Sequence, residues 1–419
     1  MPEPDAEPPF ARSAAPIFSV GAALVGLHSV VDAFLAPEPG TAAGDHLGRG
    51  LVSLALLVAA AASYPRLRAG GQVVLAVTLG ALALVGFGLA VADARAAGPT
   101  GEDWTGFLLA AAGLALIGLG IVLLWRSRKG GRLRWLRRAA IAAASVVAAY
   151  WFVMPVAIAI VATHRPRAVV APVDLGRGYE QVVVETDDGL ELAASYVPSR
   201  NGAAVISYPT RAGKIAQARM LARHGYGVLL VDARGYDASE GDPNLFGWEG
   251  TKDVAAAVRW LQRRPDVGDG RIGGIGFSVG GEVMLQAAAS NPGLRAVVSE
   301  GAGVRSIREE LLYGPRGWPS LPAAAVRTAA LALLSGAPPP PSLEDVVARN
   351  APRHLFLIYA GRGAGGEELN GDYYRAAAGP KLLWRIPEAH HVGGWEARPA
   401  EYERRVVEFF GRTLLGGRS

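Results

Sequence analysis

The chain contains no cysteine, and this absence excludes several kinds of chemistry. None of its 419 residues can form a disulfide bond, act as a thiol nucleophile or bind a metal through sulfur. Lysine is also scarce, with four residues among 42 basic side chains. The strong preference for arginine, with abundant alanine and glycine, indicates a bacterial genome of high GC content.

A basic stripe interleaved with aromatic residues is absent as well. The net charge is +5, but residues 1–168 hold 14 basic and 9 acidic side chains, whereas the remainder holds 28 of each. The basic excess therefore belongs to the more hydrophobic part of the chain. We expect no nucleic-acid partner, because such partners select a basic face on the domain that binds them.

Long hydrophobic runs fill residues 1–168, and the mean hydropathy of the whole chain, +0.23, is high for a soluble protein. Most runs have close to the roughly 20 residues that cross the hydrocarbon core of a bilayer. We therefore predict a helical transmembrane domain over residues 1–168, with the lipid bilayer as its partner. Its five spans lie at about 14–36, 48–64, 72–92, 104–125 and 139–162, the second being the shortest.

Basic residues in the short loops predict how this domain is oriented. Arg66, Arg68 and the segment 126–138, "RSRKGGRLRWLRR", form one set, whereas the alternate loops contain only Arg49 and Arg95. The positive-inside rule makes the first set cytoplasmic. Five crossings then place everything beyond about residue 165 outside the cytoplasm.

The first span raises two further points. The N-terminus, "MPEPDAEPPFAR", lacks the basic region of a cleaved signal peptide, so we interpret the span as a retained anchor. Within it, His28 and Asp32 are four residues apart and share a helix face. Ionisable residues inside a membrane are candidates for function. The simpler interpretation is a polar face that meets headgroups or a neighbouring helix.

Beyond about residue 180, strand and helix patterns alternate. Asp188-Gly189 is typical of a hairpin, and apolar strands such as "AAVISY" (203–208) then alternate with helical segments. This alternation predicts a mainly parallel sheet covered by helices on both faces. Ligands of such a sheet bind at the carboxyl ends of its strands.

Residues 271–282, "RIGGIGFSVGGE", fit two kinds of site. Gly274, Gly276 and Gly280 suggest a turn that holds the phosphates of a dinucleotide, with Glu300 as the ribose-binding acid. Their spacing is one residue longer than the standard fingerprint, and this interpretation leaves the C-terminal histidines unused. Gly276-Phe-Ser278-Val-Gly280 is also G-x-S-x-G, the turn that presents a serine nucleophile. We favour the second interpretation.

Residues about 179–415 resemble α/β-hydrolases of the serine esterase and peptidase type. The resemblance rests on "GYGVLLVDARGYDASEGD", "GFSVGGE", "VVSEGAG" and "LWRIPEAHHVGGW". It implies a triad in the order serine, acid, histidine. Ser278 is the implied nucleophile. His391 is the implied base because it stands directly before the "x-G-G" run, and His390 becomes a neighbour that shapes the pocket.

The resemblance leaves the acid open. Relatives carry an aspartate after the penultimate strand, but here the segment reads "GRGAGGEELN" and has no aspartate before Asp372. Glu367 is slightly preferred. Glu368, beside it, and Glu300, at the end of the preceding strand, are the alternatives.

The resemblance also implies an oxyanion hole, formed by the backbone N–H groups of Val279 and Thr210. The loop that supplies the second group usually begins His-Gly. Here it reads Tyr208-Pro209-Thr210-Arg211. This departure places the side chains of Tyr208 and Arg211 near the substrate pocket, although a solvated arginine is the simpler interpretation of Arg211.

Taken together, the sequence predicts a hydrolase domain over residues 169–419, with a lid insertion at about 305–346, attached to a membrane domain in a bacterial cell membrane. The function expected is hydrolysis of an ester, thioester or amide of a small, lipid or peptide substrate, without metal or other cofactor. Two alternatives stay open: a catalytically inactive relative with a binding, transport or signalling role, and an acyltransferase that uses the same triad. The sequence does not indicate an oligomeric state.

Overall fold

The computed structural model describes residues 11–36, 41–97, 103–126, 147–164, 178–209, 215–312, 314, 317–363 and 365–416. The chain forms two compact units. The first consists of Met1–Ala168 with Pro322–Gly336, and the second of Val169–Leu321 with Ala337–Ser419.

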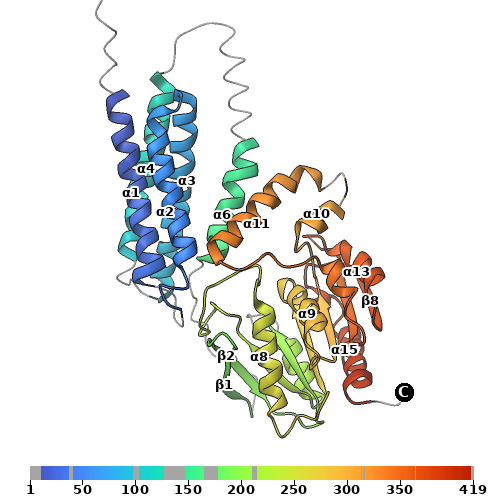
Figure 1. Ribbon diagram of the computed structural model, residues 1–419. Helices are drawn as coiled ribbons and strands as arrows, with labels where there is room; N and C mark the ends of the chain where they lie inside the picture. The colour runs from blue at the N-terminus through green and yellow to red at the C-terminus, as the bar shows by residue number, and fades with distance from the viewer. Residues whose placement is uncertain are drawn as a thin grey trace, which may run out of the picture. The chain divides into compact units, whose positions relative to one another are not determined.

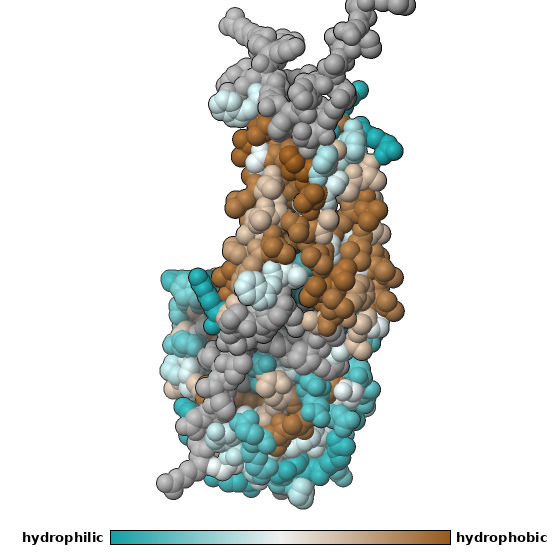
Figure 2. All heavy atoms as spheres, turned by 90° about the vertical axis from the view of Figure 1, so that its left-hand side faces the viewer, coloured by the Kyte–Doolittle hydropathy of each residue, from teal (hydrophilic) through white to brown (hydrophobic). Residues whose placement is uncertain are grey.

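Four helical stretches of the first unit are long and apolar enough to cross a membrane: Ala14–Leu35, Leu47–Arg66, Ala69–Ala92 and Trp104–Trp125. They are formed by α1 (Ala11–Val30) with the π-helical turn η1 (Val31–Leu35), α2 (Leu47–Ser63) with η2 (Tyr64–Arg66), α3 (Ala69–Ala97) and α4 (Asp103–Arg126). Large apolar side chains on these helices are exposed, among them Val20, Leu51, Val58 and Leu114. Figure 2 shows a hydrophobic surface over the helical part of the molecule. Such an apolar exterior fits a lipid environment. The prediction of a helical membrane domain is confirmed in its first four spans.

The fifth predicted span, 139–162, lies partly outside the described residues. Its described part forms η3 (Ala149–Val153) and α6 (Met154–Thr163). This apolar helix, Ala149–Thr163, is shorter than the other four.

Small residues let the helices of the first unit pack closely. A Cβ atom on Gly80 of α3 would lie 2.9 Å from the carbonyl oxygen of Gly113 in α4. Close backbone approach of this kind is how helices gain contact inside a membrane, where lipid competes for apolar side chains. At another contact the rings of Phe18 and Tyr64 stack with their centroids 3.9 Å apart.

The second unit is built on one eight-stranded sheet in the order β1-β2-β4-β3-β5-β6-β7-β8 (Figure 1). Strands β3 to β8 run parallel, whereas β1 and β2 form the predicted hairpin and β2 joins β4 antiparallel. The strands are β1 (Glu180–Glu185), β2 (Glu191–Val197), β3 (Ala204–Tyr208), β4 (Gly227–Val231), β5 (Ile272–Phe277), β6 (Ala296–Glu300), β7 (His354–Arg362) and β8 (Lys381–His390).

Two apolar cores cover the two faces of this sheet. One is formed with α8 (Gly250–Gln262), α9 (Val279–Ser290), α12 (Leu343–Val347) and α13 (Asn370–Ala376). The other is formed with α7 (Ile215–Arg223) and α15 (Pro399–Leu414). Every residue of β3, β4, β5 and β6 is buried, as expected for strands covered on both sides. The predicted fold class is confirmed.

The insertion after β6 is divided between the two units. Its first helix, α10 (Ile307–Leu312), stays with the sheet, and the buried Glu309 accepts hydrogen bonds from the backbone N–H groups of Ser306 and Leu343 at the two ends of the insertion. Most of α11 (Leu321–Ser335), which follows η5 (Trp318–Ser320), groups with the N-terminal helices instead. The guanidinium of Arg49 donates to the carbonyl oxygen of Leu334 at 3.2 Å. Most of this apolar segment therefore belongs to the first unit and not to the unit that contains the sheet.

Candidate active site

Ser278 occupies a sharp turn between β5 and α9. Its backbone has φ 54° and ψ −123°, a conformation that is rare for a residue with a side chain. The flanking glycines leave room for the turn: a Cβ on Gly276 would lie 2.2 Å from the carbonyl oxygen of Gly280, and one on Gly280 would lie 2.2 Å from that of Tyr208. These contacts explain the G-x-S-x-G spacing by local sterics, with Ser278 projecting at the carboxyl edge of the sheet.

Three side chains from three loops of that edge form a hydrogen-bonded series. His391, directly after β8, has Nε2 2.9 Å from Oγ of Ser278. Its other ring nitrogen, Nδ1, is hydrogen-bonded to Oε1 of Glu367, which follows β7 in the 3₁₀ turn η6 (Glu367–Leu369). The His391 side chain is 42% exposed and that of Glu367 is 1% exposed. A substrate can thus reach the hydroxyl and the imidazole, whereas the carboxylate is shielded from water.

The loop after β7 holds the Glu367 carboxylate in place. The backbone N–H of Ala360 donates to its Oε2 at 2.8 Å. Gly363 lies against the same group, since a Cβ there would be 2.4 Å from Oε1. Asn370 extends the support, because its side-chain amide donates to the carbonyl oxygens of Glu367 and Ala302. Both carboxylate oxygens are therefore engaged, one with the protein backbone and one with His391.

The other two carboxylates considered for the acid lie elsewhere. Glu368 is exposed. Glu300 is buried and accepts hydrogen bonds from the Gly394 backbone N–H at 2.8 Å and from the Tyr402 hydroxyl at 2.7 Å. Burial, and then the nearby Glu300, raise the pKa of Tyr402 well above its ordinary value. Glu300 therefore braces the loop that carries His391, a role that the sequence did not suggest.

The backbone N–H of Val279, the first predicted oxyanion donor, lies at the start of a helix. Val279 is the first residue of α9, and the first N–H groups of a helix have no acceptor within it. The N-terminal end of the helix also carries partial positive charge, which favours an anion there. Thr210, the predicted second donor, and Arg211 lie outside the described residues.

Tyr208 and its neighbours form a buried polar network below this edge. Tyr208 is 1% exposed, and its hydroxyl donates to Asp253 at 2.8 Å. Asp253 also accepts from the backbone N–H and the guanidinium of Arg234, which reaches Asp188 as well. Arg234 thus holds the "DARG" turn together. The Tyr208 side chain faces this network, and its backbone carbonyl lies beside Gly280.

Two further side chains complete the surroundings. His390, the last residue of β8, is exposed. Arg305, at the start of the insertion, forms a buried ion pair of 3.0 Å with Glu282 in α9 and donates to the carbonyl oxygens of Phe246 and Gly247. The ion pair attaches the first residues of the insertion to α9, the helix that begins directly after Ser278. No motif in the sequence indicated it.

Comparison with known proteins agrees with this architecture. The model of the X-Pro dipeptidyl-peptidase (S15) family matches residues 171–390. An uncharacterised protein of Mycobacterium tuberculosis is 38% identical over 118 residues, which cover 26% of this chain and 41% of that protein. The alpha/beta hydrolase domain-containing protein WAV2 of Arabidopsis thaliana is 31% identical over 131 residues, covering 29% and 42%. The match thus spans less than half the length of either relative.

Solved structures are also similar to part of this chain. The Pyrococcus furiosus esterase Pf2001 aligns with a TM-score of 0.49 and 24% identity, covering 59% of this chain and 97% of the esterase. An acylaminoacyl peptidase of Pyrococcus horikoshii aligns with a TM-score of 0.45 and 18% identity, covering 57% and 42%.

Proposed function

Because the chain belongs to the X-Pro dipeptidyl-peptidase (S15) family and is a serine hydrolase of the α/β type, we propose that Ser278, His391 and Glu367 are its catalytic triad. The observation that carries the proposal is the hydrogen-bonded series in which His391 contacts Ser278 through Nε2 and Glu367 through Nδ1. The reaction is the cleavage of an ester, thioester or amide bond through an acyl-enzyme.

In this proposal each group has its own role. His391 Nε2 removes the proton of Ser278 while Oγ attacks the substrate carbonyl carbon, and Glu367 stabilises the resulting imidazolium. The carbonyl oxygen becomes an oxyanion that accepts a hydrogen bond from the Val279 N–H. The imidazolium then donates its proton to the leaving oxygen, sulfur or nitrogen, and the acyl group stays on Ser278. Water then attacks the acyl carbon while His391 takes its proton. His391 returns this proton to Oγ of Ser278 as the acid product leaves.

A covalent probe tests the nucleophile. We expect a fluorophosphonate to label the full-length protein at Ser278, because it reacts with a serine that a neighbouring base activates. Ser278→Ala should lose the label, and Ser290→Ala, a serine at the far end of α9, should keep it. Equal labelling of wild type and Ser278→Ala would refute the assignment.

The substrate class is a separate question. The name of the family makes an X-Pro peptide the first amide to test, in the form of Gly-Pro-p-nitroanilide. It should be tested beside p-nitrophenyl esters of short and long acids. Hydrolysis of either that is lost in His391→Ala supports the triad. An acyl product that appears on an added alcohol at the expense of free acid would indicate the acyltransferase instead.

We also propose that the N-terminal helices anchor the enzyme in a bacterial membrane and that the hydrolase unit lies outside the cytoplasm. The four apolar helices support the anchor. The arginine-rich loops support the sidedness through the positive-inside rule.

Single cysteines can test the sidedness directly, because the natural chain has none. Asp187 is 81% exposed in the β1–β2 turn, and Ala69 is exposed at the start of α3, in the predicted cytoplasmic loop. On intact cells we expect a membrane-impermeant maleimide to label Asp187→Cys and to spare Ala69→Cys until the membrane is permeabilised. The reverse pattern would place the hydrolase unit in the cytoplasm.

A further inference from the structure

The first unit contains a cavity that the hydrolase chemistry does not use. Its volume is about 480 Å³, within the range of roughly 300–1,000 Å³ that small-molecule sites occupy. Helices α1 to α4 and α6 surround it, and α11 contributes Ala330, Leu333 and Leu334 to its wall. All of these residues belong to the first unit.

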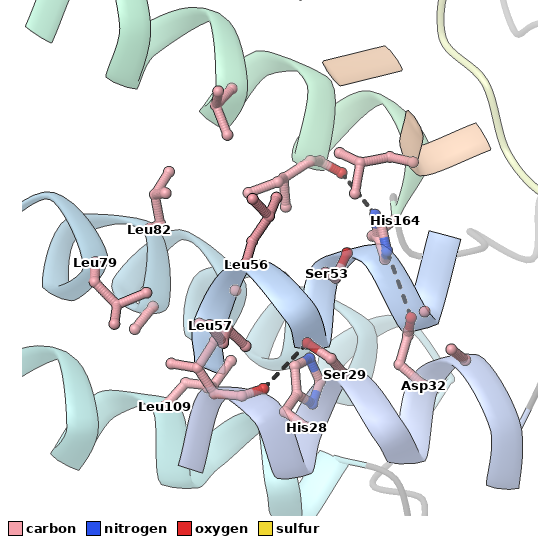
Figure 3. Close-up of a pocket in the computed structure, with 18 of the residues that line it drawn as sticks. His28, Ser29, Asp32, Ser53, Leu56, Leu57, Leu79, Leu82, Leu109 and His164 are labelled. Atoms are coloured by element: carbon pink, nitrogen blue, oxygen red, sulfur yellow. Dashed lines mark hydrogen bonds and ion pairs between the residues drawn. The ribbon is translucent and has the colours of Figure 1, made fainter. Parts of the chain in front are cut away.

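Polar side chains gather at one end of this cavity. Figure 3 shows His28, Ser29, Asp32, Ser53 and His164 close together on one side. His164 Nε2 lies 3.4 Å from Asp32, and His28 Nδ1 lies 3.1 Å from the hydroxyl of Thr105. His28 and Asp32, which share a helix face, thus point into a cavity and not only toward headgroups.

Basic groups outnumber acidic ones at this polar end. Arg49 lines the same cavity and always carries a positive charge, whereas Asp32 is the one carboxylate among the lining residues. Two histidines add positive charge whenever they are protonated. Arg49 balances the charge of Asp32, and each protonated histidine adds a positive charge that attracts an anionic group.

Most of the remainder of the cavity is apolar. Leu79, Leu82 and Leu109 lie on the side away from the polar end, and Leu56 and Leu57 lie between (Figure 3). A site of this kind, mostly apolar with a few polar groups at one end, orients an elongated ligand by its polar end. An apolar wall of this kind suits a hydrocarbon chain.

We propose that this cavity binds a single-chain amphiphile with an anionic headgroup, of the chemical class of a long-chain fatty acid or an anionic lysolipid. The headgroup lies among Arg49, His28 and His164, and the chain lies against the leucines. The proposal does not depend on the triad. Because α11 belongs to the insertion of the hydrolase, the ligand also contacts a segment that leaves and re-enters the hydrolase unit.

The test uses the full-length Ser278→Ala protein, so that no ligand is consumed. Native mass spectrometry should detect one bound palmitate per protein, and the bound fraction should reach a plateau as the palmitate concentration rises. Hexadecanol, which has the same chain without the charge, should bind at least about tenfold more weakly, because a hydrogen bond to a charged group contributes roughly 1.5–3 kcal/mol. A parallel titration with palmitoyl lysophosphatidylglycerol compares the affinity for a lysolipid with that for the fatty acid. The ligand that binds more tightly identifies the preferred anionic headgroup.

Matched variants locate the site. Arg49→Gln should weaken palmitate binding about tenfold, whereas Arg95→Gln, exposed near the end of α3, should not change it. Leu82→Trp should fill the cavity and abolish binding, whereas Leu114→Trp, 64% exposed on α4, should leave it intact. Equal affinity for palmitate and hexadecanol, or full binding by Leu82→Trp, would overturn the proposal. The alcohol comparison needs no substitution in the cavity, so it decides the question even where a cavity variant fails to fold.

Discussion

Glu367→Gln is expected to lower kcat by about four orders of magnitude, the loss typical of replacing the triad acid by its amide. The reason lies in the two hydrogen bonds of the carboxylate. The Ala360 N–H donates to Oε2, so the glutamine amide keeps its oxygen on that side and turns its NH₂ toward His391. Nδ1 must then accept, and the ring proton moves to Nε2. An imidazole that already carries a proton on Nε2 cannot take one from Ser278.

The measurement is steady-state hydrolysis of the best chromogenic substrate, together with thermal unfolding of the same samples. Glu368→Gln is the matched control, because its side chain is exposed beside Glu367, and its kcat should stay within about threefold of wild type. Glu300→Gln should lower activity much less than Glu367→Gln, since Glu300 acts on the histidine loop through Gly394. If Glu300→Gln lowers kcat by about 10⁴-fold while Glu367→Gln stays near wild type, Glu300 is the triad acid and Glu367 is not.

How far the sequence predicts this site differs among its members. The turn around Ser278 has a spacing set by sterics, and the run after His391 resembles a known pattern, so both stand out in the chain. The acid has no such local signature. Glu367 reaches Nδ1 because Gly363 leaves space for its carboxylate and Ala360 donates to it. Those contacts join the loop to the end of β7, and spacing along the chain does not reveal them.

The fold shows a similar division. Apolar runs and alternating strands predicted the helices and the sheet, because burial on two faces or in lipid requires them. The location of α11 could not be predicted from its own residues. An apolar helix of this length can pack on its own domain or on another, and the choice depends on distant groups such as Arg49, which donates to Leu334. Tyr208 is comparable, because its orientation depends on Asp253, 45 residues away.

Gly280→Ala is expected to destabilise the hydrolase unit by at least about 3 kcal/mol and to abolish labelling by the fluorophosphonate. The new Cβ would lie 2.2 Å from the carbonyl oxygen of Tyr208 and 2.5 Å from Cδ of Pro209. These are backbone and ring atoms, which cannot rotate away as the end of a flexible side chain can. Relief requires β3 and the start of α9 to separate, which displaces both Ser278 and the Val279 N–H. Thermal unfolding should show a midpoint roughly 6–12 °C lower.

Gly274→Ala is the variant to compare with Gly280→Ala. The comparison also tests the two interpretations of "GIGFSVGG". A Cβ at Gly274 would meet Sδ of Met284, 2.6 Å away, but a methionine side chain can change rotamer. The expected cost is about 1–2 kcal/mol, with full labelling of Ser278. In the dinucleotide interpretation, Gly274 would instead be the first glycine of the fingerprint, at the tight turn beside the phosphates, and its substitution would remove function. If Gly274→Ala abolishes labelling of Ser278 while Gly280→Ala keeps both labelling and stability, the nucleophile turn is the wrong interpretation.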